Sequence, residues 1–96
     1  MTDTSAGVRS EAEVRSLIRQ IVGELAPTQG VEVESQHALV GDHGYHSLAL
    51  LELAFTLEDE FGLPPIDEET AREIELVVDV ENHVVEGLAG RGDLSA

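Results

Sequence analysis

The chain has 96 residues, of which 42% are hydrophobic and 3% aromatic, and it carries 20 acidic against 5 basic side chains. This length allows one domain with one modest core, built from Leu, Val and Ile rather than from aromatic rings. The formal net charge of -15 disfavours binding to nucleic acid and to anionic membranes, and it favours partners with basic surfaces. Because the sequence has no cysteine, the chain can form no disulfide and has no thiolate of its own for catalysis or metal binding.

Both ends of the chain are predicted to be disordered tails, residues 1–9 and residues 90–96, on either side of one domain over residues 10–89. The first ten residues are small and polar, and no run approaches the roughly 18 apolar residues of a membrane span. We therefore expect a soluble, cytoplasmic protein that binds no membrane and acts as a monomer.

The first predicted helix covers residues 11–25. Ser10 followed by Glu13 has the spacing of a capping box, and Pro27 prevents the helix from continuing. Its apolar residues recur at helical spacing and form one stripe, made of Val14, Leu17, Ile18, Ile21, Val22 and Leu25.

Residues 26–46 are predicted to form a long connection without a helix or strand of its own. It contains Pro27, Gly30, Gly41 and Gly44. Connections of this length are uncommon in small domains and are often functional. We expect its apolar pair, Leu39 and Val40, to pack onto the core.

The second predicted helix covers residues 47–61, and its apolar residues fall into two stripes rather than one. Two interpretations stay open: the second stripe is a face for docking a partner, or the helix is central and buried on all sides. The stripe expected to face the core consists of Leu50, Leu53, Ala54, Leu57 and Phe61. The second stripe consists of Leu48, Leu51 and Phe55, flanked by Glu52, Glu58 and Asp59.

Two further helices complete the prediction. Gly62 is expected to end the second helix, and Asp67 is a plausible N-cap for a short helix over 68–73. Apolar residues at helical spacing predict a last helix over 77–88. The fold class is therefore all-α: a bundle of three longer helices and one short one.

Ser47 stands where a two-glycine approach meets the start of the second helix. As an N-cap residue it needs no function. As a catalytic nucleophile it would need a base and an orienting group, and neither its neighbour His46 nor Asp42 makes a convincing triad. As an attachment point it needs only exposure, and a helix N-terminus favours a negatively charged group.

The residues around Ser47 resemble those of the acyl carrier protein family. The resemblance covers roughly residues 39–85 and combines several pieces in the family's order. They are Gly44-x-His46-Ser47-Leu48, Leu51-Glu52-Leu53, Leu57-Glu58-Asp59-Glu60-Phe61, Pro65-Ile66-Asp67-Glu68-Glu69 and Val77-x-Asp79-Val80-x-x-His83-Val84.

This resemblance implies a four-helix acyl carrier that is not itself an enzyme. Ser47 would carry a covalent 4'-phosphopantetheine arm taken from coenzyme A, and Gly44 and His46 would belong to the attachment motif. The implied partners are a phosphopantetheinyl transferase, an acyltransferase or an acyl- or aminoacyl-activating ligase, and a ketosynthase or condensing enzyme. The implied recognition face consists of Leu48, Leu51, Glu52, Phe55 and Glu58.

His46 departs from the family pattern, which usually has Asp before the serine. His-Ser-Leu also occurs in peptidyl carrier domains, while the acidic second helix resembles an acyl carrier more closely. We therefore expect a stand-alone carrier for a polyketide, mixed polyketide–peptide or fatty acid pathway. The alternatives are a peptidyl or aminoacyl carrier of nonribosomal peptide synthesis, an unmodified carrier-like interaction module, and a small hydrolase that uses Ser47.

Three histidines and an aspartate, His37, Asp42, His43 and His46, also lie in the long connection. Their spacing matches no established zinc pattern, and structural zinc usually needs four good ligands. We expect no metal site here and interpret these side chains as ordinary polar residues.

Overall fold

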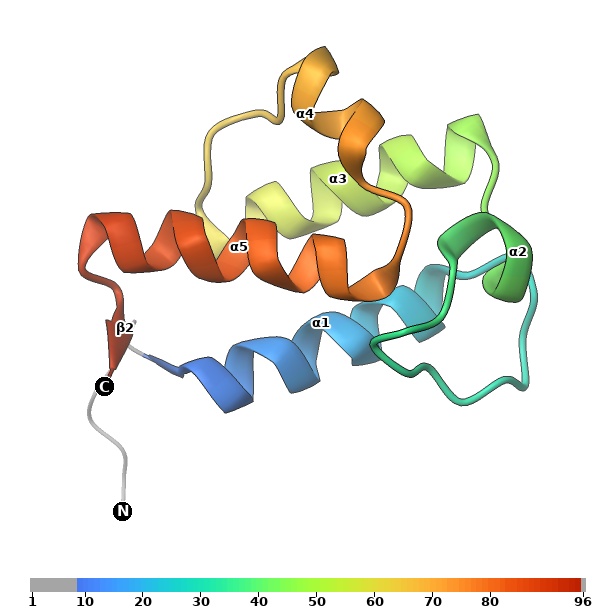
Figure 1. Ribbon diagram of the computed structural model, residues 1–96, viewed down its shortest axis with the longest axis horizontal. Coiled ribbons are helices and arrows are strands. Elements are labelled where there is room, and N and C mark those ends of the chain that lie inside the picture. Colours follow the sequence, from blue (N-terminus) through green and yellow to red (C-terminus); the bar gives the residue numbers. More distant parts are fainter. Residues whose placement is uncertain (1–8, 96) are drawn as a thin grey trace.

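The computed structural model describes residues 9–95, and it is an all-α fold (Figure 1). Its two strands are only two residues long, β1 (Arg9–Ser10) and β2 (Leu94–Ser95), and they pair in parallel. The helices are α1 (Glu11–Leu25), α2 (Leu39–His43), α3 (Ser47–Phe61), α4 (Glu68–Glu73) and α5 (Val77–Arg91).

The predicted bounds of three helices, 11–25, 47–61 and 68–73, are confirmed by α1, α3 and α4. Local signals set these bounds. Ser10 accepts a hydrogen bond from the Glu13 N–H while the Glu13 carboxylate accepts one from the Ser10 N–H. The Asp67 carboxylate accepts the Thr70 N–H at 2.7 Å, which caps α4 and lowers the pKa of Asp67.

The carboxyl end of the chain differs from the prediction. Helix α5 continues to Arg91 instead of ending at residue 88, and β2 lies within the tail predicted over residues 90–96. Arg91 holds this end in place, because its guanidinium donates to the carbonyl oxygens of Phe61 and Gly62 at the end of α3. The predicted tail is therefore helix and strand for most of its length. Residues 1–8 and 96, also predicted as tail, lie outside the described residues.

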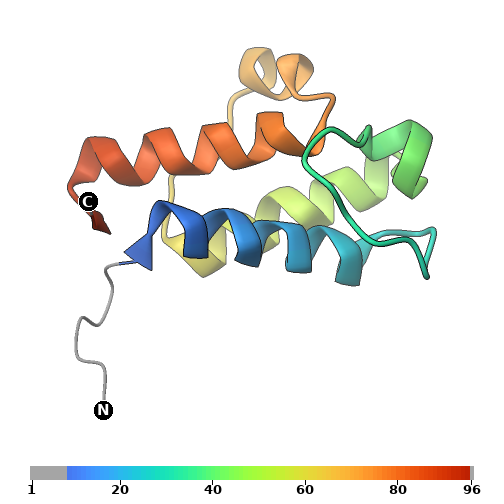
Figure 2. The same ribbon diagram turned by 60° about the horizontal axis from the view of Figure 1, so that its bottom comes forward.

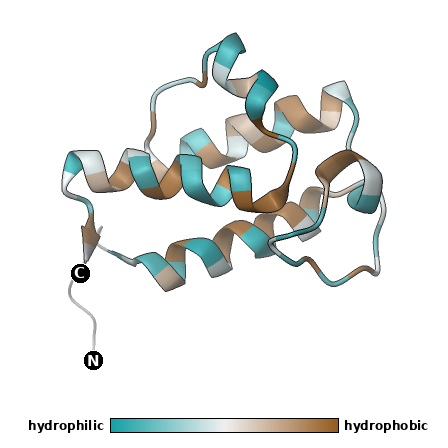
Figure 3. Cartoon of the chain, viewed as in Figure 1, coloured by the Kyte–Doolittle hydropathy of each residue, from teal (hydrophilic) through white to brown (hydrophobic). Residues whose placement is uncertain are grey.

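The core lies between the three long helices α1, α3 and α5, which pack against one another (Figures 1 and 2). Helix α4 lies outside this group and buries none of its residues, in line with the mostly hydrophilic residues that Figure 3 shows along it. None of the described helices is long and apolar enough to cross a lipid bilayer. The buried apolar side chains of the three long helices include Val14, Ile18, Ile21, Val22, Leu53, Leu57, Phe61, Val77, Val80, Val84, Val85 and Leu88.

The connection between α1 and α3 contains a helix that the sequence analysis did not predict, α2. Leu39 is buried as expected, but Val40 is 62% exposed, so the prediction that both would pack onto the core is wrong for Val40. Adjacent residues of a helix point about 100° apart, so α2 can bury one of them and not the other.

The same connection also covers the start of α5. The carbonyl oxygens of Ser35 and His37 accept the Val78 and Val77 N–H groups at 2.8 and 2.9 Å. These N–H groups have no acceptor within their own helix. The connection is thus fixed to α5 by backbone hydrogen bonds.

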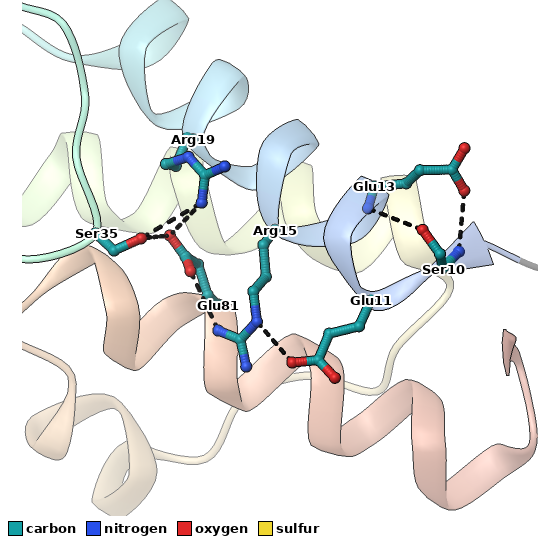
Figure 4. A network of polar contacts seen from close by, with 7 residues as sticks. All are labelled: Ser10, Glu11, Glu13, Arg15, Arg19, Ser35 and Glu81. Atoms are coloured by element: carbon teal, nitrogen blue, oxygen red, sulfur yellow. Dashed lines mark hydrogen bonds and ion pairs between the residues drawn. The ribbon is translucent and has the colours of Figure 1, made fainter. Parts of the chain in front are cut away.

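A buried carboxylate links α5 to α1 and to the connection (Figure 4). The side chain of Glu81 is 1% exposed, and the guanidinium groups of Arg15 and Arg19 contact its two oxygens at 3.1 and 3.3 Å. Ser35 Oγ donates a third hydrogen bond to it at 2.7 Å. A buried carboxylate is tolerated only with such partners.

We predict that Glu81→Gln lowers the free energy of unfolding by about 3 kcal/mol, because it removes the buried negative charge that Arg15 and Arg19 both contact. The matched control is Glu11→Gln, which removes the exposed ion pair of Arg15 at 2.9 Å and should cost less than about 1 kcal/mol. Urea unfolding of both variants measures the difference. Equal losses would show that the buried carboxylate has no special part in the fold.

Candidate functional site

Ser47 is the first residue of α3, and its side chain is exposed. The first N–H that is bonded within the helix is that of Leu50, which donates to the His46 carbonyl at 2.8 Å. The N–H groups before it have no acceptor within the helix, and the first turn contains no acidic residue. The Ser47 hydroxyl therefore lies at an accessible helix end that favours a bound anion.

The turn before Ser47 depends on Gly44. This residue ends α2 with φ 72°, in the left-handed region, where only glycine is free of strain. Its surroundings are also tight, since a Cβ at this position would collide with Thr28 Oγ1. The Thr28 N–H donates to the His43 carbonyl at 3.1 Å, so α2 and the residues after α1 approach each other closely here.

Tyr45 fixes the backbone two residues before Ser47. Its ring is buried, and its hydroxyl donates to the Val22 carbonyl of α1 at 2.8 Å. Burial raises the pKa of Tyr45 to about 12, and the nearby carboxylate of Glu52 adds to the effect. This aromatic side chain thus anchors the start of α3 to α1.

The second apolar stripe of α3 is exposed. Leu48, Leu51 and Phe55 are 66%, 53% and 60% exposed, while Leu53, Leu57 and Phe61 on the other side are buried. The interpretation that α3 is buried on all sides is therefore wrong. Three large apolar side chains in a row on one helix form a surface suited to a partner.

Two of the three acidic residues expected beside this stripe differ in their exposure. Glu52 is exposed, whereas Glu58 is half-buried. The Glu58 carboxylate accepts the Ile66 N–H at 3.3 Å, so it also holds the link between α3 and α4. The exposed stripe and these two carboxylates, which we call the α3 face, are Leu48, Leu51, Glu52, Phe55 and Glu58.

The histidines have unequal surroundings. His46 is exposed and precedes Ser47 as the N-cap residue of α3, without a capping hydrogen bond from its side chain. His43 is completely buried on α2. Within residues 9–95, no group of three or more His, Cys, Asp or Glu side chains is placed to hold a metal ion.

No side chain among the described residues forms a hydrogen bond to the Ser47 hydroxyl. The Asp42 carboxylate is engaged elsewhere, since it accepts the Ala38 N–H at 2.7 Å. A serine without a base or an orienting group is not activated as a nucleophile by its own chain.

The burial of two residues that shape the site, Tyr45 and His43, was not predicted from the sequence. A signal for α2 was present, because Leu39 and His43 are four residues apart and Gly44 follows directly. The burial of Tyr45 had no comparable local signal, since its partner Val22 is 23 residues away. Long-range contacts of this kind are not encoded in periodicity.

A family model described as a phosphopantetheine attachment site matches residues 16–69, more than half of the chain. The acyl carrier protein of Thermobifida fusca (strain YX) is 29% identical over 75 residues, which are 78% of this chain and 94% of that protein.

Two solved structures are also similar. An acyl carrier protein from Thermotoga maritima has a TM-score of 0.67 at 22% sequence identity. The match includes 83% of this chain and 92% of that one. A candidate acyl carrier protein from Mycobacterium tuberculosis has a TM-score of 0.59 at 30% identity, with 79% and 95% coverage.

We predict that stability decreases as the pH rises from about 9 to about 11, because the unfolded chain releases the Tyr45 proton near pH 10 and the folded chain keeps it until about pH 12. The contribution is complete below pH 10, and its loss over this range should reach about 1 to 2 kcal/mol. Urea unfolding at several pH values measures it.

The control for this prediction is Tyr45→Phe, which should lack the alkaline loss. Since Tyr45 is the only tyrosine, tyrosinate absorbance reports its ionisation directly. A folded protein that forms tyrosinate near the ordinary pKa would contradict the proposed anchor.

Proposed function

Because this chain belongs to the acyl carrier protein family, we propose that Ser47 carries the 4'-phosphopantetheine arm of the protein. The family assignment makes the chain a carrier rather than an enzyme, and the arm is its covalent cofactor. The single observation that supports Ser47 is its position: an exposed hydroxyl on the first residue of α3, within the matched residues 16–69.

The surroundings of Ser47 fit such a group. Its hydroxyl is accessible to a second enzyme, and the free N–H groups of the first turn favour the negative charge of a phosphodiester. No acidic residue stands in that turn to repel it. No side chain of the described residues acts as a base on Ser47, and modification by another enzyme does not require one.

The chain's own residues then present the modified serine. Tyr45 and Gly44 fix the start of α3. The α3 face begins directly after Ser47 and continues along the same helix. When attached, the arm supplies a thiol that holds an acyl group as a thioester and gives it reach between enzymes.

We propose that partner enzymes recognise the α3 face. Its apolar residues are exposed next to Ser47, and the chain carries a net charge of -15, so basic partner surfaces should bind it with salt sensitivity. The partners we propose are a phosphopantetheinyl transferase, an acyltransferase or acyl-activating ligase, and a condensing enzyme, all in the cytoplasm.

For the pathway, we propose a polyketide, mixed polyketide–peptide or fatty acid route. The T. fusca relative supports an acyl carrier, and the acidic α3 is consistent with one. His46 favours the second candidate, a peptidyl or aminoacyl carrier, because of the His-Ser-Leu resemblance. Loading with fatty-acyl-activating enzymes against amino-acid-activating enzymes distinguishes the two.

We predict that intact protein gains the mass of one phosphopantetheine when incubated with coenzyme A and a broad-specificity transferase, and that Ser47→Ala gains none. The matched control is Ser16→Ala, an exposed serine of α1 that should be modified like the wild type. A gain of this mass by Ser47→Ala would show that the arm is attached to another residue.

We also predict that Leu51→Ala and Phe55→Ala each lower kcat/KM for arm transfer or acyl loading at least about tenfold, while the free energy of unfolding changes by less than about 0.5 kcal/mol. The small stability effect follows from the exposure of both side chains.

The control for the α3 face is Val31→Ala, which truncates an exposed apolar residue outside it. Steady-state kinetics at two salt concentrations with each variant provide the comparison. Unchanged kinetics in both α3 variants would show that partners bind elsewhere.

A further inference from the structure

Two histidines of the connection lie in contact beside the start of α3. His37 Nδ1 and His43 Nε2 are 3.0 Å apart, and the ring centroids are 5.0 Å apart with an angle of 52° between the planes. His43 is completely buried, and His37 is half-buried. We call these two residues the histidine pair.

The hydrogen bonds around the pair determine where its protons are. The Glu34 N–H donates to His37 Nδ1 at 3.3 Å, so this nitrogen carries a lone pair. The shared proton must therefore be on His43 Nε2, which donates to His37 Nδ1. His43 Nδ1 is then an unprotonated nitrogen, and it has no partner among the described residues.

An added proton has no suitable place in this arrangement. On His43 Nδ1 it would create a buried, charged N–H without an acceptor. On His37 Nδ1, the added proton would face the Glu34 N–H. His37 would then be the donor of the shared hydrogen bond, so the proton on His43 Nε2 would have to move to His43 Nδ1. Both protonated forms thus leave an unsatisfied buried group.

The surrounding charges do not remove this conflict. Burial and the neighbouring His37 lower the pKa of His43, and Asp42, which acts in the opposite direction, does not outweigh them. The Asp42 carboxylate is bonded to the Ala38 N–H at 2.7 Å. At the start of α5, the Asp79 carboxylate accepts the Glu75 and Leu76 N–H groups at 3.0 and 2.9 Å.

The pair lies between the contacts that hold the connection. The His43 carbonyl accepts the Thr28 N–H, and the His37 carbonyl accepts the Val77 N–H of α5. Between them, the Leu39 N–H donates to the Glu75 carbonyl at 3.0 Å. Because only three residues separate the end of α2 from Ser47, separation of the pair would release the backbone that leads into α3.

We propose that the histidine pair is an acid-sensitive switch that holds the connection, and with it the start of α3, in place only while the buried His43 is neutral. Acid favours the open connection, because an exposed histidine takes up a proton that the closed pair excludes. The effect on the arm rests on the proposed function of Ser47, whereas the switch itself is a property of the unmodified chain.

Amide hydrogen exchange on the unmodified full chain tests this proposal. Lowering the pH from about 7.5 to about 5.5 should reduce the protection of the connection, after correction for intrinsic exchange, by about tenfold. The amides concerned are Thr28, Leu39, Tyr45 and Val77. Amides inside α1 and α5, such as those of Val22 and Val84, should keep their protection.

The variant His43→Phe should lose this pH response, and the control His83→Gln on α5 should keep it. An equal response in His43→Phe, or none in the wild type, would overturn the proposal. Nitrogen-15 spectra of the wild-type imidazoles add a test that needs no variant. They should show His43 neutral with its proton on Nε2 at about pH 5.5, and a charged His43 in the folded protein would overturn the proposal.

Discussion

Helix α3 has two apolar stripes, and the fold can bury only one of them. The long helices α1 and α5 cover the side that carries Leu53, Leu57 and Phe61, while α4 is too short and too hydrophilic to cover the other side. Among the residues that the structure describes, no further element is left to cover it. The stripe that starts at Leu48 is left exposed beside Ser47, so the same packing constraint provides both a stable core and a surface for partners.

The other requirement of a carrier is that its attachment residue stays in one place. The connection before α3 meets it with few contacts: Tyr45 bonds to α1, Gly44 turns tightly against Thr28, and backbone hydrogen bonds tie the connection to the start of α5. The buried carboxylate of Glu81 also stabilises this arrangement, since it joins α1, α5 and Ser35 of the connection. Order in the connection thus depends on polar groups that must be satisfied inside the protein.

Local signals in the sequence were sufficient for most of the fold. The caps at Ser10, Asp67 and Gly62 gave helix bounds that the structure confirms, because each acts within a few residues of the helix end. The second stripe of α3 also followed from spacing, whereas the role of Ser47 was chosen among the possible ones by the resemblance to the acyl carrier protein family. What spacing could not give were the long-range contacts: the burial of Tyr45 and His43, the role of Glu81, and the extension of α5 to Arg91, which depends on carbonyl groups of α3. Each of these is decided by residues distant in sequence.

The footprint of a phosphopantetheinyl transferase on the nitrogen-15-labelled protein, followed by NMR, tests most directly where this carrier meets its enzymes. We expect the signals of Ser47, Leu48, Leu51 and Phe55 to change, with stronger effects at low salt. We expect no change at the opposite end of the bundle, around Arg9 and Arg91. A footprint on that end, or on α1, would contradict the claim that the exposed side of α3 is the surface at which this carrier meets its enzymes.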